Sequence, residues 1–244
     1  MHPVLLKFGF FTIYSYGFML ALAFLAGIAL AVFFAKKEGI PPENIFDLSI
    51  FVILAAIIGG RTFYVLEFYS DFIHRPLSVF FIWEGGLVFF GGMFFAMLAI
   101  YLFAKKAKAD PLKYYDAITP AVLVGYAIGR LGCFLNGCCY GEVCSLPWAV
   151  QFPLAFGLRH PTQIYSSIAG VMMFVLLYFL YRKKSFDGQI FFSGLLLYST
   201  YRFIMEFLRT NPKYFLGLSE AQWICVVIFI VSVYICKILK GGKK

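Results

Sequence analysis

The chain has 244 residues, of which 62% are hydrophobic and only 14% are charged, and its formal net charge is +9. An ordinary soluble domain has about 25% charged residues, so this composition excludes that class and indicates an integral membrane protein. The positive charge does not indicate a nucleic-acid partner. The lysines are confined to a few short stretches between apolar segments, which is the pattern that sets membrane topology.

Seven stretches approach the roughly 20 apolar residues that a membrane-spanning helix needs. They cover residues 14–35, 46–66, 84–103, 116–135, 163–181, 189–208 and 220–238. Between them we detect no soluble domain, low-complexity linker or internal repeat. The sequence therefore predicts an all-α polytopic protein in which residues 1–244 form a single domain with seven transmembrane helices.

The distribution of positive charge predicts the orientation of this bundle. The stretches after the first, third and fifth spans and the C-terminal tail hold thirteen of the 21 lysines and arginines, among them Lys243 and Lys244. Such residues mark the cytoplasmic side, so the N-terminus is expected outside and the C-terminus in the cytoplasm. Trp83, Trp148 and Trp223 then fall at the outer ends of spans or in the outer loop, where tryptophan prefers the headgroup level.

Four arginines fall near the outer ends of the second, fourth and sixth spans, namely Arg61, Arg130 and Arg202, with Arg209 just beyond. A helix C-terminus stabilises a cation by only about 0.3–1 kcal/mol, less than the roughly 2.5–3.5 kcal/mol cost of an arginine at mid-span. Glu206 lies four residues after Arg202 and three before Arg209, so one helix face is expected to present Arg-Glu-Arg. Each arginine alone could snorkel or pair within the bundle. Four at one depth indicate a site for an anionic headgroup, with phosphate held bidentately.

Residues 125–144 concentrate five glycines and four cysteines around Arg130. The C-x4-CC-x4-C spacing lacks the C-x2-C pairs of a zinc site, so neither a metal nor another cofactor is expected. A disulfide from Cys138 or Cys139 to Cys144 remains open on the oxidising outer side. The simplest interpretation is that these cysteines, with Cys133, are small apolar residues that fill helix contacts beside the glycines.

Several motifs follow one another along the chain in a recognisable order. The central one is GRLGCFLNG at residues 129–137 with Gly141; WEGGLVFFGG at 83–92 precedes it and RHPTQIY at 159–165 follows it. Tyr16-Gly17, Gly60-Arg61 and YRFIMEFLR at 201–209 complete the set. The ordered set runs along the chain through the first six predicted spans and resembles the prolipoprotein diacylglyceryl transferase family.

The resemblance implies a multi-pass enzyme of the bacterial cytoplasmic (inner) membrane. It implies transfer of the diacylglyceryl group from phosphatidylglycerol, a membrane lipid, to the lipobox cysteine thiol of a prolipoprotein signal peptide. The transfer forms a thioether and releases glycerol phosphate. Arg130 and Arg209 are then expected to bind the phosphate and stabilise the leaving group. The other expected lipid-binding positions are Tyr16, Arg61, Gly91, Gly92, Asn136, Gly141 and Arg202.

Four positions depart from the family pattern. Phe90 stands where many members have histidine, Cys133 where asparagine is common, and Cys138 and Ser166 where glutamate is common. Because phenylalanine cannot take a proton, these departures leave the general base open, and they keep a catalytically inactive homologue as an alternative.

Three hypotheses remain for the fate of the thiol proton. His160 or Glu206 could accept it, or it could pass to water in the positive field of Arg130 and Arg209. His160 could equally be a loop residue that bonds backbone. A carrier or flippase for anionic lipid is a further alternative, but alternating access needs polar groups at both depths. The inner halves of the predicted spans are nearly free of charge, which favours an enzyme.

Three residues are expected to shape helix ends. Asp116 and Thr162 are expected as N-caps of the fourth and fifth spans, and Pro120 as a first-turn residue of the fourth span. Tyr198 and Tyr201 share the outer part of the sixth span with Arg202. We therefore expect these two tyrosines to lie near the anion site.

Overall fold

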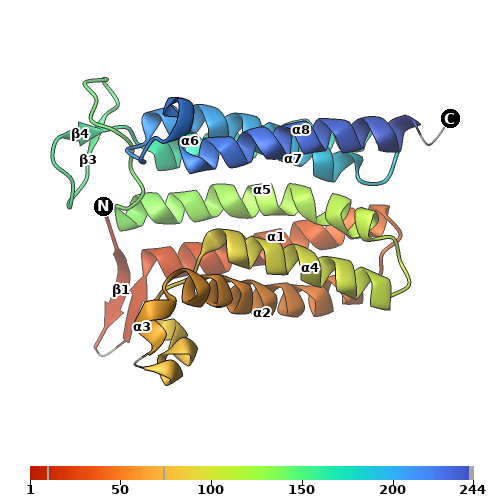
Figure 1. Cartoon of the computed structure of the whole chain (residues 1–244), viewed down its shortest axis with the longest axis horizontal. Coiled ribbons are helices and arrows are strands. Elements are labelled where there is room, and N and C mark those ends of the chain that lie inside the picture. The colour runs from red at the N-terminus through yellow and green to blue at the C-terminus, as the bar shows by residue number, and fades with distance from the viewer. Residues whose placement is uncertain (10, 74, 242–244) are drawn as a thin grey trace. The chain divides into compact units, whose positions relative to one another are not determined.

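The computed structural model describes residues 1–9, 11–73 and 75–241, with all side chains in these ranges except those of residues 11, 84 and 89. Two compact units make up the chain. Unit 1 comprises Met1–Phe34 and Asp116–Lys244, and unit 2 comprises Ala35–Tyr115. Figure 1 shows the helices and strands of both units.

Helices occupy all seven predicted ranges. The long helices are α1 (Ser15–Lys37), α2 (Pro42–Glu67), α4 (Phe89–Lys106), α5 (Pro111–Asn136), α6 (Thr162–Tyr181), α7 (Gln189–Met205) and α8 (Glu220–Gly241). A short helix α3 (Tyr69–Ile73) and 3-10 turns at Pro76–Phe80, Ile82–Glu84, Glu206–Leu208 and Phe215–Gly217 connect them. The described part of the chain is therefore mostly helical, as the sequence predicts.

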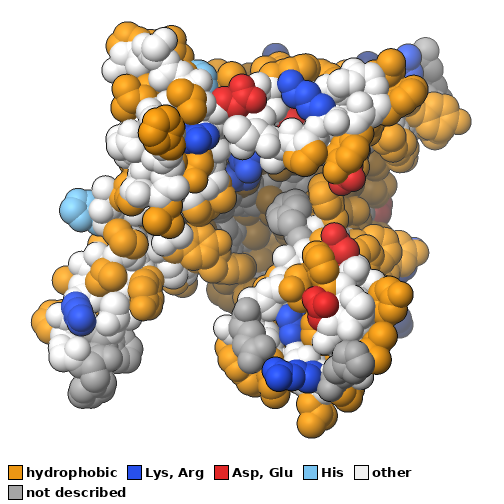
Figure 2. All heavy atoms as spheres, turned by 60° about the vertical axis from the view of Figure 1, so that its left-hand side comes forward, with side chains coloured by type: hydrophobic (Ala, Val, Ile, Leu, Met, Phe, Trp, Pro, Cys, Tyr) orange, Lys and Arg blue, Asp and Glu red, His pale blue; other side chains and the backbone are white. Residues whose placement is uncertain are grey.

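Five helices of the described residues are long and apolar enough to cross a membrane, namely α1, α2, α5, α6 and α8. Figure 2 shows apolar side chains across the whole face in view, with charged side chains scattered among them. Leu154 and Phe156 are each 91% exposed, which suits hydrocarbon or interfacial surroundings better than water. The protein is thus a multi-pass membrane protein. Its orientation stays a prediction, and Lys243 and Lys244 lie outside the described residues.

Small residues bring the helices of unit 1 together. A Cβ on Gly170 of α6 would lie 3.1 Å from the Leu123 carbonyl of α5, and one on Gly194 of α7 would lie 2.4 Å from Thr119 Cγ2 of α5. A Cβ on Gly132 of α5 would lie 3.0 Å from Met19 Cβ of α1. Such close approach is how membrane helices gain packing contacts without a hydrophobic driving force between them.

Glycines also set the contact between α2 and α4 in unit 2. A Cβ on Gly91 would lie 2.5 Å from the Gly59 carbonyl oxygen, and one on Gly92 would lie 2.9 Å from the Ala56 carbonyl oxygen. The structure thus gives both predicted lipid-binding glycines a packing role. Their role in lipid binding stays a prediction.

Two antiparallel strand pairs were not predicted. β1 (Val4–Phe8) pairs with β2 (Phe11–Tyr14), and β3 (Val150–Gln151) pairs with β4 (Leu158–Arg159). The first pair precedes α1 and is rich in β-branched and aromatic residues, which favour strands. Its residues do not alternate between polar and apolar, so the sequence pattern does not distinguish these strands from the apolar helix that follows. The second pair lies in the segment between α5 and α6, in which Trp148 is 57% exposed.

Asp116 does not cap the fourth span, because α5 begins five residues earlier at Pro111. Its carboxylate instead accepts the backbone N–H groups of Gly188 (2.7 Å) and Phe191 (2.8 Å), at the start of α7. Lys184 Nζ lies 2.8 Å from the same carboxylate. Asp116 therefore stabilises the N-terminus of a different helix, a long-range role that local capping patterns do not reveal.

Thr162 is also not a cap, since it is the first residue of α6 and the preceding position is Pro161. Its hydroxyl donates to the carbonyl of Cys139 at 2.8 Å. Pro120 lies inside α5 and not in its first turns. Both errors follow from helices that begin earlier than the apolar runs.

Candidate functional site

A glycine-rich turn follows α5 and is held in place by the first turn of α6. Gly137 (φ +78°) and Cys139 (φ +66°) adopt the left-handed conformation, which costs a non-glycine residue energy. The Cys138 carbonyl accepts from Gln163 Nε2, and the Cys139 carbonyl accepts from the Thr162 hydroxyl. The turn is therefore fixed by two side chains that lie more than twenty residues away in sequence.

Gly141 connects this turn to the end of α7. Its N–H donates to the His160 carbonyl at 3.0 Å, and the N–H of Glu142 donates to the Leu208 carbonyl at 2.9 Å. A Cβ on Gly141 would lie 2.5 Å from the Leu208 carbonyl oxygen, which is closer than van der Waals contact permits. Only glycine fits here, and its contact fixes the backbone next to Arg209.

Arg130 projects from α5 toward a group of tyrosines. Its guanidinium carbon lies 4.9 Å from the ring centroid of Tyr126. That ring meets Tyr198 edge-on at 5.7 Å, and Tyr198 is followed by Tyr201 at 6.4 Å. Among the described residues no carboxylate lies within 4.0 Å of Arg130. The cation–π contact stabilises the cation but does not neutralise it.

Arg209 also lacks a neutralising partner among the described residues. Its Nε is buried and has no hydrogen-bond partner among the residues that the structure describes. The predicted Arg-Glu-Arg face is wrong at this residue, because α7 ends at Met205 and Arg209 follows a 3-10 turn in an extended conformation (φ −114°, ψ 149°). A buried donor without an acceptor is costly, so this side chain is suited to a ligand that supplies one.

Glu206 and Arg202 form the part of the predicted face that is confirmed. They make an ion pair, and Glu206 is 3% exposed. The other carboxylate oxygen accepts from Asn211 Nδ2 (2.5 Å) and the Ser219 hydroxyl (2.9 Å). Glu206 thus ties the loop before α8 to the end of α7, and both of its oxygens are engaged.

Three thiols lie together at the turn. The Sγ atoms of Cys133, Cys138 and Cys139 are all within 4.8 Å of one another, and the last two are 3.2 Å apart. All six cysteines are free thiols in this structure. The alternative of a disulfide to Cys144 is therefore not realised here.

The turn also lies in the field of both arginines. The pKa of the Cys139 thiol is lowered to about 5, first by a hydrogen bond from Cys133 and further by the charges of Arg130 and Arg209. Burial raises the pKa of the Cys138 thiol. The charges of Arg130 and Arg209 therefore both reach this turn.

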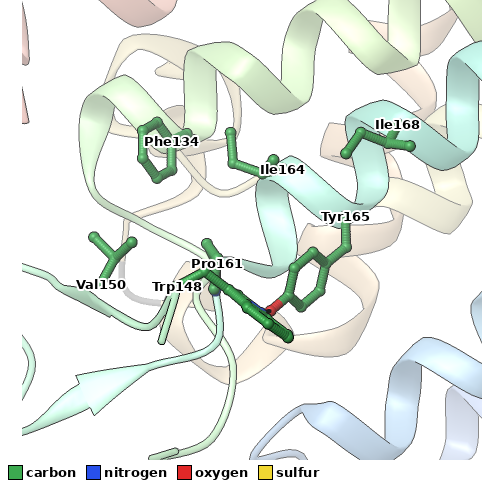
Figure 3. A pocket seen from close by; sticks show the side chains of 7 residues that line it. All are labelled: Phe134, Trp148, Val150, Pro161, Ile164, Tyr165 and Ile168. Carbon is green, nitrogen blue, oxygen red and sulfur yellow. Dashed lines mark hydrogen bonds between the residues drawn. The ribbon is translucent and has the colours of Figure 1, made fainter. Parts of the chain in front are cut away.

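His160 lies beside an apolar pocket of about 380 Å³. Its Nδ1 is 3.4 Å from the Tyr165 hydroxyl, which accepts a hydrogen bond from Trp148 Nε1 at 2.6 Å. Figure 3 shows α5 contributing Phe134 to the pocket and α6 contributing several side chains. The lining residues are Phe134, Trp148, Val150, Pro161, Ile164, Tyr165 and Ile168.

Tyr16 and Asn136 lie near the same turn. Tyr16, in the first turn of α1, is 42% exposed and interacts electrostatically with Arg130 and the three thiols. Asn136 is the last residue of α5 and its side chain reaches that of Cys138. Unit 1 therefore brings together Tyr16, Arg130, Asn136, Gly141, His160 and Arg209 from α1, α5, the turn, and the ends of the α6 and α7 segments.

Comparison with known proteins gives this arrangement a family. The profile of prolipoprotein diacylglyceryl transferases matches residues 3–238. The chain belongs to this family. It is similar to the phosphatidylglycerol–prolipoprotein diacylglyceryl transferase of Clostridium tetani, with 35% identity over 251 residues and 100% of both chains covered. The transferases of Bordetella avium (36%, covering 93% of this chain and 90% of that one) and Finegoldia magna (35%, 94% of each) are also similar.

Arg61, a predicted headgroup ligand, has a different environment in unit 2. It is 7% exposed, and its guanidinium donates to the backbone carbonyls of Val79 (2.9 Å), Gly85 (2.7 Å), Gly86 (3.2 Å) and Ser78 (2.5 Å). In this family member the side chain thus fixes the 3-10 segments that follow α3. Its part in lipid binding stays a prediction.

Sequence reasoning missed several residues that support the site. Arg159 donates to the Gly141 carbonyl (3.2 Å) and lies over the Tyr140 ring at 5.1 Å. Tyr126 could have been found, since it lies one helical turn before Arg130. Gln163 belongs to the RHPTQIY motif, but its contact with the Cys138 carbonyl was not predicted, because that partner is 25 residues away.

Ser166, at a position where the resemblance implied glutamate, has partners for its hydroxyl. Its hydroxyl donates to the Thr162 carbonyl and accepts from the Tyr201 hydroxyl, both at 2.6 Å. Ser166 and Tyr201 therefore satisfy each other's hydroxyl groups, and Tyr201 belongs to the group of tyrosines toward which Arg130 projects.

Proposed function

We propose that the protein transfers the diacylglyceryl group from phosphatidylglycerol to the lipobox cysteine thiol of prolipoproteins and releases glycerol phosphate. The observation that carries this proposal is the pair of arginines, Arg130 and Arg209, that lie near one turn without a carboxylate partner among the described residues. Seven membrane spans, an outer N-terminus, a site open to the outer leaflet and a place in the bacterial cytoplasmic membrane belong to the same proposal.

The chemistry explains why unneutralised cations are needed. The thiol sulfur forms a bond to the terminal glyceryl carbon while the bond from that carbon to the phosphate oxygen breaks, and the electron pair leaves with the phosphate. The phosphodiester carries one negative charge and the departing monoester gains another. Guanidinium groups that bind phosphate oxygens stabilise this added charge most in the transition state. A carboxylate on either arginine would cancel that effect.

The thiol proton needs an acceptor, and the geometry favours His160 over Glu206. Both oxygens of Glu206 already accept bonds or pair with Arg202. His160 Nδ1 faces the Tyr165 hydroxyl, and its Nε2 has no partner in the described part of the chain. Substitution His160→Gln is expected to lower the transfer rate by about 10²–10⁴-fold. A loss of only a few-fold would exclude His160 as the base.

The apolar pocket beside His160 gives the hydrocarbon part of a substrate a place to lie. Its seven lining side chains are apolar or aromatic, and ligand sites are commonly apolar with a few placed polar groups. The hydroxyl of Tyr165 is the polar group here, held by Trp148. Such a pocket suits a lipid or signal-peptide side chain better than a water-soluble substrate.

The proposal is tested by reconstituting the full chain with phosphatidylglycerol and a lipobox peptide. The expected product is the peptide with a diacylglyceryl thioether, formed in equal amount with glycerol phosphate and measured by mass spectrometry. An anionic-lipid carrier would instead move phosphatidylglycerol between leaflets without modifying the peptide. Absence of the thioether under conditions in which the Clostridium tetani relative forms it would refute the transferase assignment.

A further inference from the structure

The three thiols at the turn have the spacing of a metal-binding set. Cys133 lies in the last turn of α5, and Cys138 and Cys139 lie in the turn that follows. Their Sγ atoms are within 4.8 Å of one another. Thiolates bound to one ion at about 2.3 Å are themselves about 4 Å apart. The sulfur separations in this structure are therefore close to those that one bound ion would impose.

The backbone holds this arrangement at an energetic cost that simple packing does not require. Cys139 has φ +66°, which costs a non-glycine residue about 1–2 kcal/mol. Hydrogen bonds from Thr162 and Gln163 to the carbonyls of the two turn cysteines keep the strained conformation. Small apolar residues that only fill a helix contact need no such support, whereas a ligand set needs its backbone fixed.

The charges nearby also suit bound thiolates. Three thiolates exceed the charge of one monovalent or divalent ion by one or two units. Arg130 lies three residues before Cys133 in α5, and Arg209 follows Leu208, whose carbonyl accepts from the N–H of Glu142 beside the turn. The thiolate is the form that binds metal, so the surroundings compensate the charge that binding would leave.

We propose that Cys133, Cys138 and Cys139 form a site for one thiophilic d¹⁰ metal ion, zinc(II) or copper(I). Binding converts the three thiols to metal-bound thiolates and releases their protons to water. Copper(I) accepts three sulfurs alone, whereas zinc(II) takes a fourth ligand such as water. The C-x4-CC spacing does not predict a metal site from the sequence, because zinc sites commonly use C-x2-C pairs. Here the left-handed turn brings the second and third cysteines back to the first.

The first test is equilibrium metal binding to the full-length chain in detergent, reduced and then freed of reductant without air. Zinc(II) and copper(I) are each titrated in competition with a chromophoric chelator. The expected result is one ion per chain for at least one metal. Cys138→Ser and Cys139→Ser should weaken its binding at least tenfold, and the matched controls Cys144→Ser and Cys236→Ser should not.

The second test needs no variant and so does not depend on variant folding. The wild-type protein is alkylated with and without the metal, and each cysteine is quantified by mass spectrometry. The ion should protect Cys133, Cys138 and Cys139 together but not Cys144. Absence of binding for both metals, equal binding by Cys139→Ser, or a disulfide within the trio in protein isolated without reductant would each overturn the proposal. None of these outcomes depends on transferase activity.

Discussion

Two arginine environments in this protein differ in what satisfies the cation. In unit 2, Arg61 makes four hydrogen bonds to carbonyls of residues 78–86. In unit 1, Arg130 has an aromatic ring, Tyr126, for a neighbour, and Arg209 has a buried Nε with no acceptor among the described residues. The first cation is satisfied by the protein, and the others need something from outside.

The difference separates structural arginines from ligand-binding ones where sequence could not. All of these residues look alike in the sequence, as single arginines near the ends of apolar runs. An arginine in a membrane helix is costly, so each needs a reason to be there. Four carbonyl acceptors are sufficient reason for Arg61. For Arg130 and Arg209 the compensating charge is expected to be the phosphate of the lipid.

Among the arginine variants the largest effect is expected for Arg130→Ala, which should lower the transfer rate by about 10²–10³-fold, the usual loss when one charge-stabilising donor is removed. Arg130→Lys should recover only part of this rate, because an ammonium group cannot hold phosphate bidentately. Initial rates with saturating lipobox peptide measure both variants. Full activity of Arg130→Ala would show that the cation serves another purpose.

Arg61→Met should act on stability. Removal of the guanidinium leaves several part-buried carbonyls without these donors, each at a cost of up to about 1–3 kcal/mol, so the melting temperature in detergent should fall. Arg130→Met removes an unneutralised cation from a helix and should change the melting temperature much less. The exposed Arg75→Met serves as a control in the same unit. Equal thermal shifts for Arg61→Met and Arg130→Met would remove the distinction between the two environments.

A smaller effect is expected for Gly141→Ala. The added Cβ would lie 2.5 Å from the Leu208 carbonyl oxygen, and overpacking of this kind costs about 1–3 kcal/mol. The backbone shift that relieves it should displace Arg209 and raise KM for phosphatidylglycerol. Gly129→Ala is the matched control, since a Cβ there meets nothing within 4 Å. If both variants behave alike, the contact between the turn and α7 does not position Arg209.

The sequence predicts the helices well, because long apolar runs determine them. It predicts their ends poorly. α5 begins at Pro111, before its apolar run, so Asp116 lies inside the helix and its carboxylate reaches the start of α7. α7 ends at Met205, which removes Arg209 from the face it was expected to share with Glu206. Such ends depend on tertiary contacts that local pattern does not contain.

In the candidate site, too, some features could be predicted from the sequence and others depend on tertiary contacts. Family motifs predict Arg130, Asn136, Gly141 and His160, and the structure brings them to one turn of unit 1. The proximity of Cys133 to Cys139 was not predictable, because it depends on a left-handed residue and on hydrogen bonds from α6. The environment of Arg61 was hidden for a similar reason, since its acceptors are backbone carbonyls, which every sequence has.

The central claim is that the unneutralised arginines hold the lipid phosphate, and equilibrium binding of a short-chain phosphatidylglycerol tests it most directly. Isothermal titration of the wild-type protein and of Arg209→Ala, without peptide, measures binding separately from chemistry. The account predicts at least tenfold weaker binding by Arg209→Ala and no comparable difference for the uncharged diacylglycerol. Equal affinity of both proteins for phosphatidylglycerol would contradict it.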